Sequence, residues 1–358
     1  MTRFRELDGL RGIAAIVVVG SHFTGAYNSR YPDDPVAIVD LGWGAYGVQL
    51  FFLISGFVIL MSASRAQRPS DFVISRAARL YPAYWLSLAL AVGVGALARV
   101  PHVPLDPWVI VANLSMVQRW FLVENVNDVY WTLAIEMQFY ALIVVLLVAT
   151  RSRISDRLVA WLVVVWLVVA LAVAWWAGPF SRGTSPQNVI APVKMVLNVS
   201  LAEFGPLFSL GMLAYLSRRE GRLHPLVPVA AAVAAAVAWI LHSWVDGLWV
   251  AGICAGFIAV VLRPTTKPLT TPPVQWLGAR SYSLYVVHSI LGFALIRWLW
   301  PVTGRDLAMP AAFAVVLLAT WACHAVGEQL LSSLMRRAML RWRDRNRESD
   351  RPAEGQHG

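Results

Sequence analysis

Two ionisable side chains stand in the first apolar stretch of the chain, LDGLRGIAAIVVVGSHF at residues 7–23. His22 follows Arg11 by eleven positions, which is about 16 Å along a helix. If this helix enters a membrane, Arg11 lies at the boundary and His22 at or beyond the midplane. Ionisable groups at that depth are costly and functional by default. His22 is therefore a candidate general base, and the alternative is a structural histidine satisfied by a neighbouring backbone carbonyl.

A second embedded ionisable group occurs in VYWTLAIEMQFY, residues 129–140. Glu136 lies about six residues into an apolar span, so its depth is expected to match that of His22. A carboxylate in lipid needs a partner or stays protonated. We expect Glu136 to accept a hydrogen bond from one ring nitrogen of His22, which leaves the other nitrogen basic. The alternative is that both residues are structural.

A pair of arginines offers a different chemistry. Arg76 and Arg79 are three positions apart, so they share a face of the short helix expected within residues 65–80. Two guanidinium groups on one face suit a phosphate-bearing ligand. The alternative is that they only mark topology or contact lipid head groups.

Weaker candidates lie in the second half of the chain. Glu203 is embedded and is expected to pair or to cap a helix, and His288 lies near the middle of its span. His324 and Glu328 are four positions apart, so a mutual pair on one helix is their simplest interpretation.

The elements that would position these groups are membrane-spanning helices. The chain has 358 residues, of which 58% are hydrophobic and 14% charged, whereas about a quarter of the residues of a soluble protein are charged. Apolar runs of about 20 residues cross a bilayer as helices. We therefore predict an all-α membrane protein with about ten such helices, at residues 11–28, 44–64, 81–98, 130–149, 158–177, 197–217, 226–243, 246–262, 280–300 and 308–333.

The net charge of +10 indicates orientation rather than nucleic-acid binding. With a cytoplasmic N-terminus, the termini and the even-numbered connections hold 23 of the 30 basic residues. Positive charge concentrates on the cytoplasmic side of membrane proteins, so both termini are predicted to be cytoplasmic. Cys254 and Cys323 fall within predicted spans and offer neither a disulfide framework nor a metal site.

The domain organisation is expected to be simple. Residues 1–336 form one membrane domain, and residues 337–358 form a basic, disordered cytoplasmic tail. Residues 65–80 read as a short basic helix at the interface, and the segment 99–130 could include a re-entrant or interfacial piece.

Five stretches, in this order, resemble the acyltransferase 3 family of integral membrane acyltransferases. They are LDGLRGIAAIVVVGSH, GVQLFFLISGFVI, FVISRAARLYPAYW, WTLAIEMQFY and LGARSYSLYVVH, and the similarity runs from about residue 5 to 335. The resemblance implies transfer of a short acyl group from cytoplasmic acyl-CoA, with acetyl-CoA as the expected co-substrate and no permanently bound cofactor. It implies as acceptor a hydroxyl of a surface polysaccharide, a lipid-linked sugar or a small molecule, in the bacterial cytoplasmic membrane.

The family motifs assign roles to residues of this chain. The Arg and His motif is matched by Arg11 and His22, and the acyl-CoA motif Arg-x-x-Arg by Arg76 and Arg79. The embedded acid is matched by Glu136, which follows Trp131. The correspondence is looser for Glu203, Tyr282 and Glu328, and His288 stays a tentative site residue.

Two mechanisms remain open at this stage. His22 removes the acceptor proton during direct transfer, or it carries the acyl group covalently. Arg11 steadies either the CoA or a developing oxyanion. The competing function is a secondary transporter with a buried His, Glu and Arg site, but the paired broken helices typical of transporters are not found in the sequence.

Overall fold

The regular elements of the protein are helices. The computed structural model describes residues 4–101, 103–183, 188–263 and 267–349. In these ranges nine helices are long and apolar enough to cross a membrane, and a tenth apolar helix, Leu226–Leu241, is shorter. The prediction of an all-helical chain is confirmed for these ranges, and each of the ten predicted spans overlaps one of these helices.

The first half of the chain contains the helices that carry most of the predicted site residues. Helix α1 continues through a π-helical turn, η1, into α2, and α3 follows a 3-10 turn, η2. The bounds are α1 Arg5–Ser21, η1 His22–Ala26, α2 Tyr27–Arg30, η2 Gly42–Tyr46, α3 Gly47–Ala63, α4 Pro69–Ala98, α5 Pro107–Asn113, η3 Gln118–Phe121 and α6 Tyr130–Ala149.

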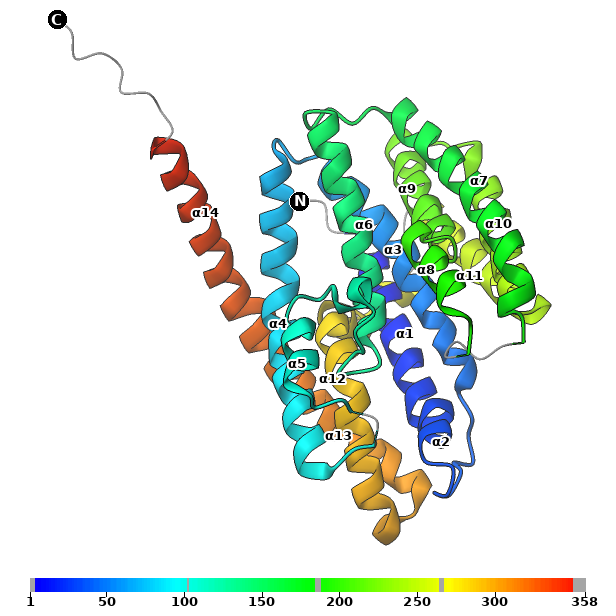
Figure 1. Ribbon diagram of the computed structural model, residues 1–358, viewed down its shortest axis with the longest axis vertical. Helices are drawn as coiled ribbons and strands as arrows, with labels where there is room; N and C mark the ends of the chain where they lie inside the picture. Colours follow the sequence, from blue (N-terminus) through cyan, green and yellow to red (C-terminus); the bar gives the residue numbers. More distant parts are fainter. Residues whose placement is uncertain (1–3, 102, 184–187, 264–266, 350–358) are drawn as a thin grey trace, which may run out of the picture.

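The second half supplies a lateral group of helices and then returns to the centre. Figure 1 shows α7 to α11 together on one side of the molecule, while α12 lies beside α1 and α14 lies at the opposite edge, beside α4. The bounds are α7 Asp156–Ser181, α8 Ala191–Ser200, α9 Gly205–Glu220, α10 Leu226–Leu241, α11 Trp244–Leu262, η4 Lys267–Thr270, α12 Pro272–Thr303, α13 Arg305–Cys323, η5 His324–Leu331 and α14 Ser332–Ser349.

Small residues let the central helices approach closely. A Cβ atom on Gly211 of α9 would lie 2.1 Å from the Leu53 carbonyl oxygen of α3, and one on Gly56 of α3 would lie 2.2 Å from the Phe208 carbonyl oxygen of α9. Gly278 of α12 meets the Asp8 carbonyl oxygen of α1 in the same way, at 2.0 Å. Membrane helices associate largely by such backbone packing, so these glycines fix the spacing between helices.

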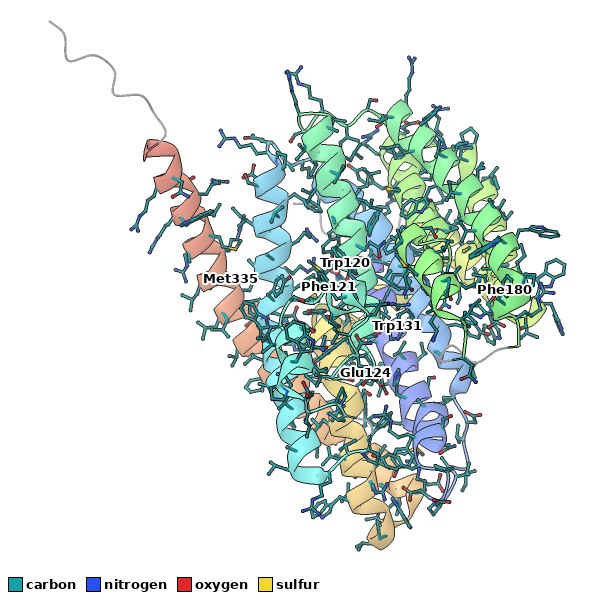
Figure 2. All side chains as sticks on the ribbon, in the orientation of Figure 1. Trp120, Phe121, Glu124, Trp131, Phe180 and Met335 are labelled. Carbon is teal, nitrogen blue, oxygen red and sulfur yellow. The ribbon has the colours of Figure 1, made fainter. Side chains whose placement is uncertain are left out.

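One expectation about the connections is corrected by the structure. Residues 69–80 are not a separate short helix, because α4 runs unbroken from Pro69 to Ala98 and includes Pro82. Arg76 and Arg79 line a cavity, so α4 can carry these two charged side chains without turning them to lipid. The described part of residues 99–129 includes the short helix α5 and the turn η3, near the labelled Trp120, Phe121 and Glu124 (Figure 2), and the expectation of a re-entrant or interfacial piece there stays a prediction.

The C-terminal tail also differs from the expected disorder. Helix α14 continues to Ser349, and residues 350–358 lie outside the described part of the chain. Helix α14 packs along α4, where Arg343 Nη1 donates to Asp71 Oδ1 at 2.5 Å. A basic helix that pairs with α4 in this way has a partner that its composition does not reveal.

Candidate functional site

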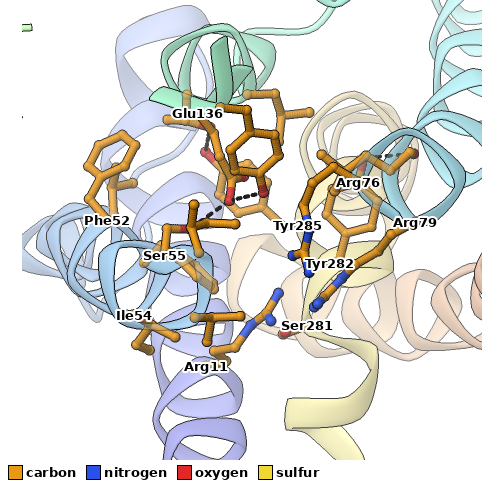
Figure 3. A pocket seen from close by; sticks show the side chains of 18 residues that line it. Arg11, Phe52, Ile54, Ser55, Arg76, Arg79, Glu136, Ser281, Tyr282 and Tyr285 are labelled. Atoms are coloured by element: carbon orange, nitrogen blue, oxygen red, sulfur yellow. Dashed lines mark hydrogen bonds between the residues drawn. The ribbon is translucent and has the colours of Figure 1, made fainter. Parts of the chain in front are cut away.

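Three arginines meet in one cavity between α1, α3, α4, α6 and α12. Figure 3 shows Arg11 from α1 and Arg76 and Arg79 from α4 converging on this space. We call it the arginine cavity; its polar lining is Arg11, Ser55, Arg76, Arg79, Thr132, Glu136, Tyr140, Ser281, Tyr282 and Tyr285. Glu136 is the one acidic residue of this lining, so the cavity carries an excess of positive charge and suits an anionic ligand.

Glu136 is held by two hydroxyl groups. Its Oε1 accepts hydrogen bonds from Ser55 Oγ of α3 and from Tyr140 OH, each at 2.6 Å. Arg76 Nη2 donates to Ser62 Oγ at 3.0 Å, which ties α4 to the end of α3. These bonds fix side chains that face the cavity, and Arg79 lines the same space beside them.

The expected hydrogen bond between Glu136 and His22 is absent from the structure. His22 lines a different cavity, and its Nδ1 lies 2.9 Å from the Val18 carbonyl oxygen. A carbonyl only accepts, so Nδ1 carries the hydrogen and Nε2 of the neutral ring keeps its lone pair. The prediction of a basic ring nitrogen therefore stands on a different partner, one turn earlier on the same helix.

His22 opens the π-helical turn that interrupts α1. Residues His22–Ala26 form this turn, and single π-helical turns are frequent at functional sites. The buried Arg305 of α13 donates from Nη2 to the Phe23 carbonyl oxygen at 2.5 Å, and its guanidinium lies 3.9 Å from the centre of the Tyr27 ring. A side chain from the far end of the sequence thus stabilises the backbone beside the candidate base.

His288 packs directly against His22. The two ring centroids are 4.8 Å apart and the rings are nearly perpendicular. His288 is fully buried, and its Nδ1 lies 2.8 Å from the Tyr285 carbonyl oxygen, so it carries the hydrogen on that nitrogen. The structure thus brings this tentative residue next to His22, as a wall of the site.

His22 faces a second, wider cavity, which we call the outer cavity. Its polar lining consists of Ser21, His22, Trp43, Tyr46, Gln49, Trp131, Glu203, His242, Asp246 and Tyr285. Glu203 Oε1 lies 2.9 Å from His242 Nε2, and Tyr46 OH donates to Asp246 Oδ1 at 2.7 Å. The Glu203 carboxylate raises the pKa of His242 above its ordinary value, since it stabilises the protonated ring.

Aromatic rings form one side of the outer cavity. The rings of Trp43 and Trp249 are stacked with centroids 6.0 Å apart, and Tyr46 stacks on Trp249 at 5.3 Å. Flat apolar faces next to carboxylates and hydroxyl groups suit a molecule that has both apolar faces and hydroxyl groups.

The two cavities adjoin each other. Val48 of α3 and Tyr285 of α12 line both of them. Tyr285 OH lies 2.8 Å from Thr132 Oγ1, so the ring is fixed between the cavities. Helix α1 connects the two spaces, with Arg11 in the arginine cavity and His22 in the outer cavity.

The remaining sequence candidates divide between these places. Trp131 and Glu203 line the outer cavity and Tyr282 lines the arginine cavity, where its OH donates to the Leu80 carbonyl oxygen at 3.0 Å. The predicted pair of His324 and Glu328 is confirmed, with Nδ1 and Oε1 3.1 Å apart. Glu328 also accepts from Ser283 Oγ at 2.5 Å, which joins η5 to α12.

Several site residues were missed from the sequence. Tyr140 stands four positions after Glu136, and this spacing on one helix was a usable signal. Ser55, His242, Asp246 and Arg305 come from distant segments, and their roles depend on helix packing that a single sequence does not reveal.

The sequence of this chain is similar to those of known proteins. A family model described as an acyltransferase domain matches residues 4–325. Exopolysaccharide production protein ExoZ of Rhizobium meliloti (strain 1021) is 30% identical over 322 residues, which cover 83% of this chain and 92% of ExoZ. Acyltransferase MdmB of Streptomyces mycarofaciens is 25% identical, with 97% of this chain and 94% of MdmB covered.

A third relative extends beyond the matched region. A putative O-acetyltransferase of Staphylococcus aureus (strain COL) is 28% identical, and the match covers 82% of this chain but 50% of that protein. No solved structure matches this chain.

Proposed function

Because this chain belongs to the acyltransferase 3 family, we propose that it transfers an acyl group, acetyl first of all, from cytoplasmic acyl-CoA to a hydroxyl group of an acceptor. The observation that carries this proposal is the pair of adjoining cavities on α1, one rich in arginine and one containing His22. Two such spaces would let an anionic donor and a polar acceptor reach one point from opposite sides of a membrane. The protein would act in the bacterial cytoplasmic membrane with both termini inside.

The arginine cavity is the proposed donor site. Arg76 and Arg79 would hold CoA phosphates, since guanidinium groups form charge-assisted bonds with phosphate oxygens. Arg11 lies with them, so we assign it to the donor and not to an oxyanion beside His22. The acyl end would point toward Tyr285 and Val48, where the outer cavity begins.

The outer cavity is the proposed acceptor site. The relatives include an exopolysaccharide production protein, an acyltransferase and a putative O-acetyltransferase. A hydroxyl group of a surface polysaccharide, a lipid-linked sugar or a small molecule is therefore the proposed acceptor. Stacked aromatic rings and the Glu203 and Asp246 carboxylates would contact its flat faces and hydroxyl groups.

His22 would drive the transfer through Nε2. In direct transfer, the acceptor oxygen attacks the thioester carbonyl, Nε2 takes the hydroxyl proton, and the carbon–sulfur bond breaks to release CoA. General-base help of this kind accelerates a reaction by about 10²–10⁴-fold. In the covalent version, Nε2 attacks the thioester and releases CoA, and the acceptor hydroxyl then displaces the imidazole as its proton is lost.

One labelling experiment separates these versions. Purified protein in lipid nanodiscs is incubated with acetyl-labelled CoA and no acceptor. Label on the protein that disappears in His22→Ala supports the covalent version. Absence of label, together with CoA release once a glycan acceptor is added, supports direct transfer.

The same experiment can overturn the proposal. If wild-type protein shows neither label nor CoA release with a broad panel of acceptors, and Arg76→Ala with Arg79→Ala binds acyl-CoA as the wild type does, the two-cavity assignment is wrong. Glu136→Gln removes the negative charge from the arginine cavity, but its amide oxygen can still accept the hydrogen bonds from Ser55 Oγ and Tyr140 OH.

A further inference from the structure

An apolar groove lies on the surface between η3, α6 and α8. Its apolar walls are Trp120, Leu122, Ala134, Ile135, Met195 and Val199. Of these side chains, Trp120, Leu122, Met195 and Val199 are exposed. Figure 2 labels Trp120 and Trp131 on the face of the bundle that is turned to the viewer. In a membrane protein such a face is turned to lipid, so the natural occupant of the groove is an apolar chain.

The groove has a polar floor that lipid chains alone do not explain. Arg119 Nη2 donates to Asn198 Oδ1 at 2.5 Å, and Gln138 Nε2 donates to the carbonyl oxygens of Asn198 and Val199 at 3.0 and 2.9 Å. Among the described residues no carboxylate forms an ion pair with Arg119. The Glu203 carboxylate of the outer cavity acts on Arg119 only from beyond ion-pair distance, and it is itself paired with His242. A guanidinium that borders lipid without a close ion-pair partner favours an anionic group at this end of the groove.

The groove borders the outer cavity through one aromatic ring. The Arg119 guanidinium lies 5.7 Å from the centre of the Trp131 ring, and Trp131 lines the outer cavity. The Trp131 ring also packs against Phe204, another lining residue of that cavity, with centroids 5.6 Å apart. A molecule whose charged group reaches Arg119 is therefore one side chain away from the space that contains His22.

We propose that the groove binds an acceptor in which a phosphate or diphosphate links a lipid chain to a hydroxylated head group. The chain lies against Met195 and Val199, the phosphate bonds to Arg119, and the head group passes Trp131 into the outer cavity. This inference rests on the proposed function, since it names the class of acceptor. It assigns to Arg119 and Trp131 the positioning of the acceptor, and no chemical step.

The first test measures binding, without any acyl transfer. The probes are geranylgeranyl diphosphate and the uncharged geranylgeraniol, added to the full-length protein in phosphatidylcholine nanodiscs and followed by native mass spectrometry. The wild type is expected to bind the diphosphate at least tenfold more tightly than the alcohol, because the Arg119 guanidinium forms charged hydrogen bonds with the diphosphate and not with the neutral alcohol. Arg119→Gln is expected to reduce this ratio to within about threefold of unity.

Controls identify the source of the binding. Arg182→Gln removes an exposed arginine that bonds to the Ile240 carbonyl oxygen and does not line the groove, so it should preserve the ratio. Inorganic diphosphate with geranylgeraniol should not reproduce the tight binding. If Arg119→Gln keeps the full ratio, or if phosphatidylglycerol displaces the probe as readily as unlabelled diphosphate does, the proposed site is wrong.

The second test uses acyl transfer to separate this inference from the proposed function. Val199→Trp fills the groove, and Val168→Trp places the same ring on α7, where the side chain is exposed to a similar degree (68% for Val199 and 61% for Val168). Val199→Trp should lower transfer to a lipid-linked sugar at least tenfold but leave transfer to a water-soluble sugar unchanged. Equal losses with both acceptors would overturn the groove.

A second groove variant guards against misfolding. Met195→Trp fills the same groove from another position on α8 and should give the same split between acceptors. If no protein transfers acyl groups to any acceptor, the proposed function fails. The binding ratio of Arg119→Gln still decides whether the groove recognises a phosphate-linked lipid.

Discussion

At the scale of single residues, the arginine cavity predicts how donor binding depends on charge. Arg76→Gln and Arg79→Gln should each raise the KM for acyl-CoA by about 10–100-fold, because each removes about 1.5–3 kcal/mol of charged hydrogen bonding to phosphate. The kcat should change by only a few-fold, since these guanidinium groups would hold the CoA phosphates equally well in the ground state and in the transition state. Steady-state kinetics with varied acyl-CoA measures both constants.

The matched control for these variants is Arg68→Gln. Arg68 precedes the same helix, is exposed and does not line the arginine cavity, so its loss should leave the KM unchanged. Lysine variants keep the charge but lose the planar fork and should fall between wild type and glutamine. A fall in kcat at constant KM would assign Arg76 and Arg79 to the chemical step instead.

The pair formed by Glu203 and His242 predicts a dependence of stability on pH. Because the carboxylate raises the pKa of His242, its contribution is fully present below the unfolded pKa of about 6.5 and is lost as the pH rises through the folded value. The melting temperature of the wild type should therefore fall from about pH 6.5 upward more steeply than that of Glu203→Gln. Thermal melts in nanodiscs at several pH values measure this, and parallel curves would contradict it.

The partner of His22 shows which contacts a sequence can predict. The expected depth of His22 and of Glu136 follows from their positions in apolar runs, and both fall within helices long and apolar enough to cross a membrane. Depth alone does not give azimuth, and Glu136 turns to Ser55 and Tyr140 in a separate cavity. The carbonyl of Val18 takes the role expected for Glu136, since a backbone group one turn away is always within reach.

At the scale of helices, the central packing predicts a sharp sensitivity to side-chain size. Gly211→Val would place a Cβ atom 2.1 Å from the Leu53 carbonyl oxygen, so α3 and α9 must separate. We expect loss of most folded protein, because the interface depends on close backbone contact. Gly252→Val on α11 is the control, since no heavy atom lies within 4 Å of its Cβ position.

The yield of monodisperse protein by size-exclusion chromatography measures both variants. A wild-type yield for Gly211→Val would show that α3 and α9 can move apart without loss of the fold. A loss for Gly252→Val equal to that for Gly211→Val would indicate a general intolerance of valine in these helices and not a close approach.

The elements show where sequence prediction works and where it stops. Length and hydropathy locate all ten apolar spans, because a bilayer sets the length of a helix that crosses it. The continuity of α4 from residues 69–80 into the predicted span 81–98 was missed, because the first part is basic and hydropathy alone begins the apolar span after it. The π-helical turn at His22 was missed as well, because its stabilising partner Arg305 comes from the far end of the chain.

At the scale of the whole molecule, the two cavities give the protein two chemically different sides. The arginine cavity lies toward the helix ends that carry the basic connections, such as Arg153 and Arg219, and the outer cavity lies toward the opposite ends. Tyr285 and Val48 line both, so the proposed donor and acceptor would approach one point from different cavities. The direction of the reaction across the membrane then depends on which side faces the cytoplasm.

That orientation predicts the result of cysteine labelling on intact cells. The native Cys254 and Cys323 are buried, so their background labelling by a membrane-impermeant maleimide should be low. Arg153→Cys, on an exposed basic connection, should be labelled only after the cells are permeabilised, since positive charge concentrates on the cytoplasmic side. Asp33→Cys, on an exposed connection at the opposite ends, should be labelled in intact cells. The reverse pattern would place the arginine cavity on the outside, where acyl-CoA could not reach it, and would exclude the proposed direction of transfer.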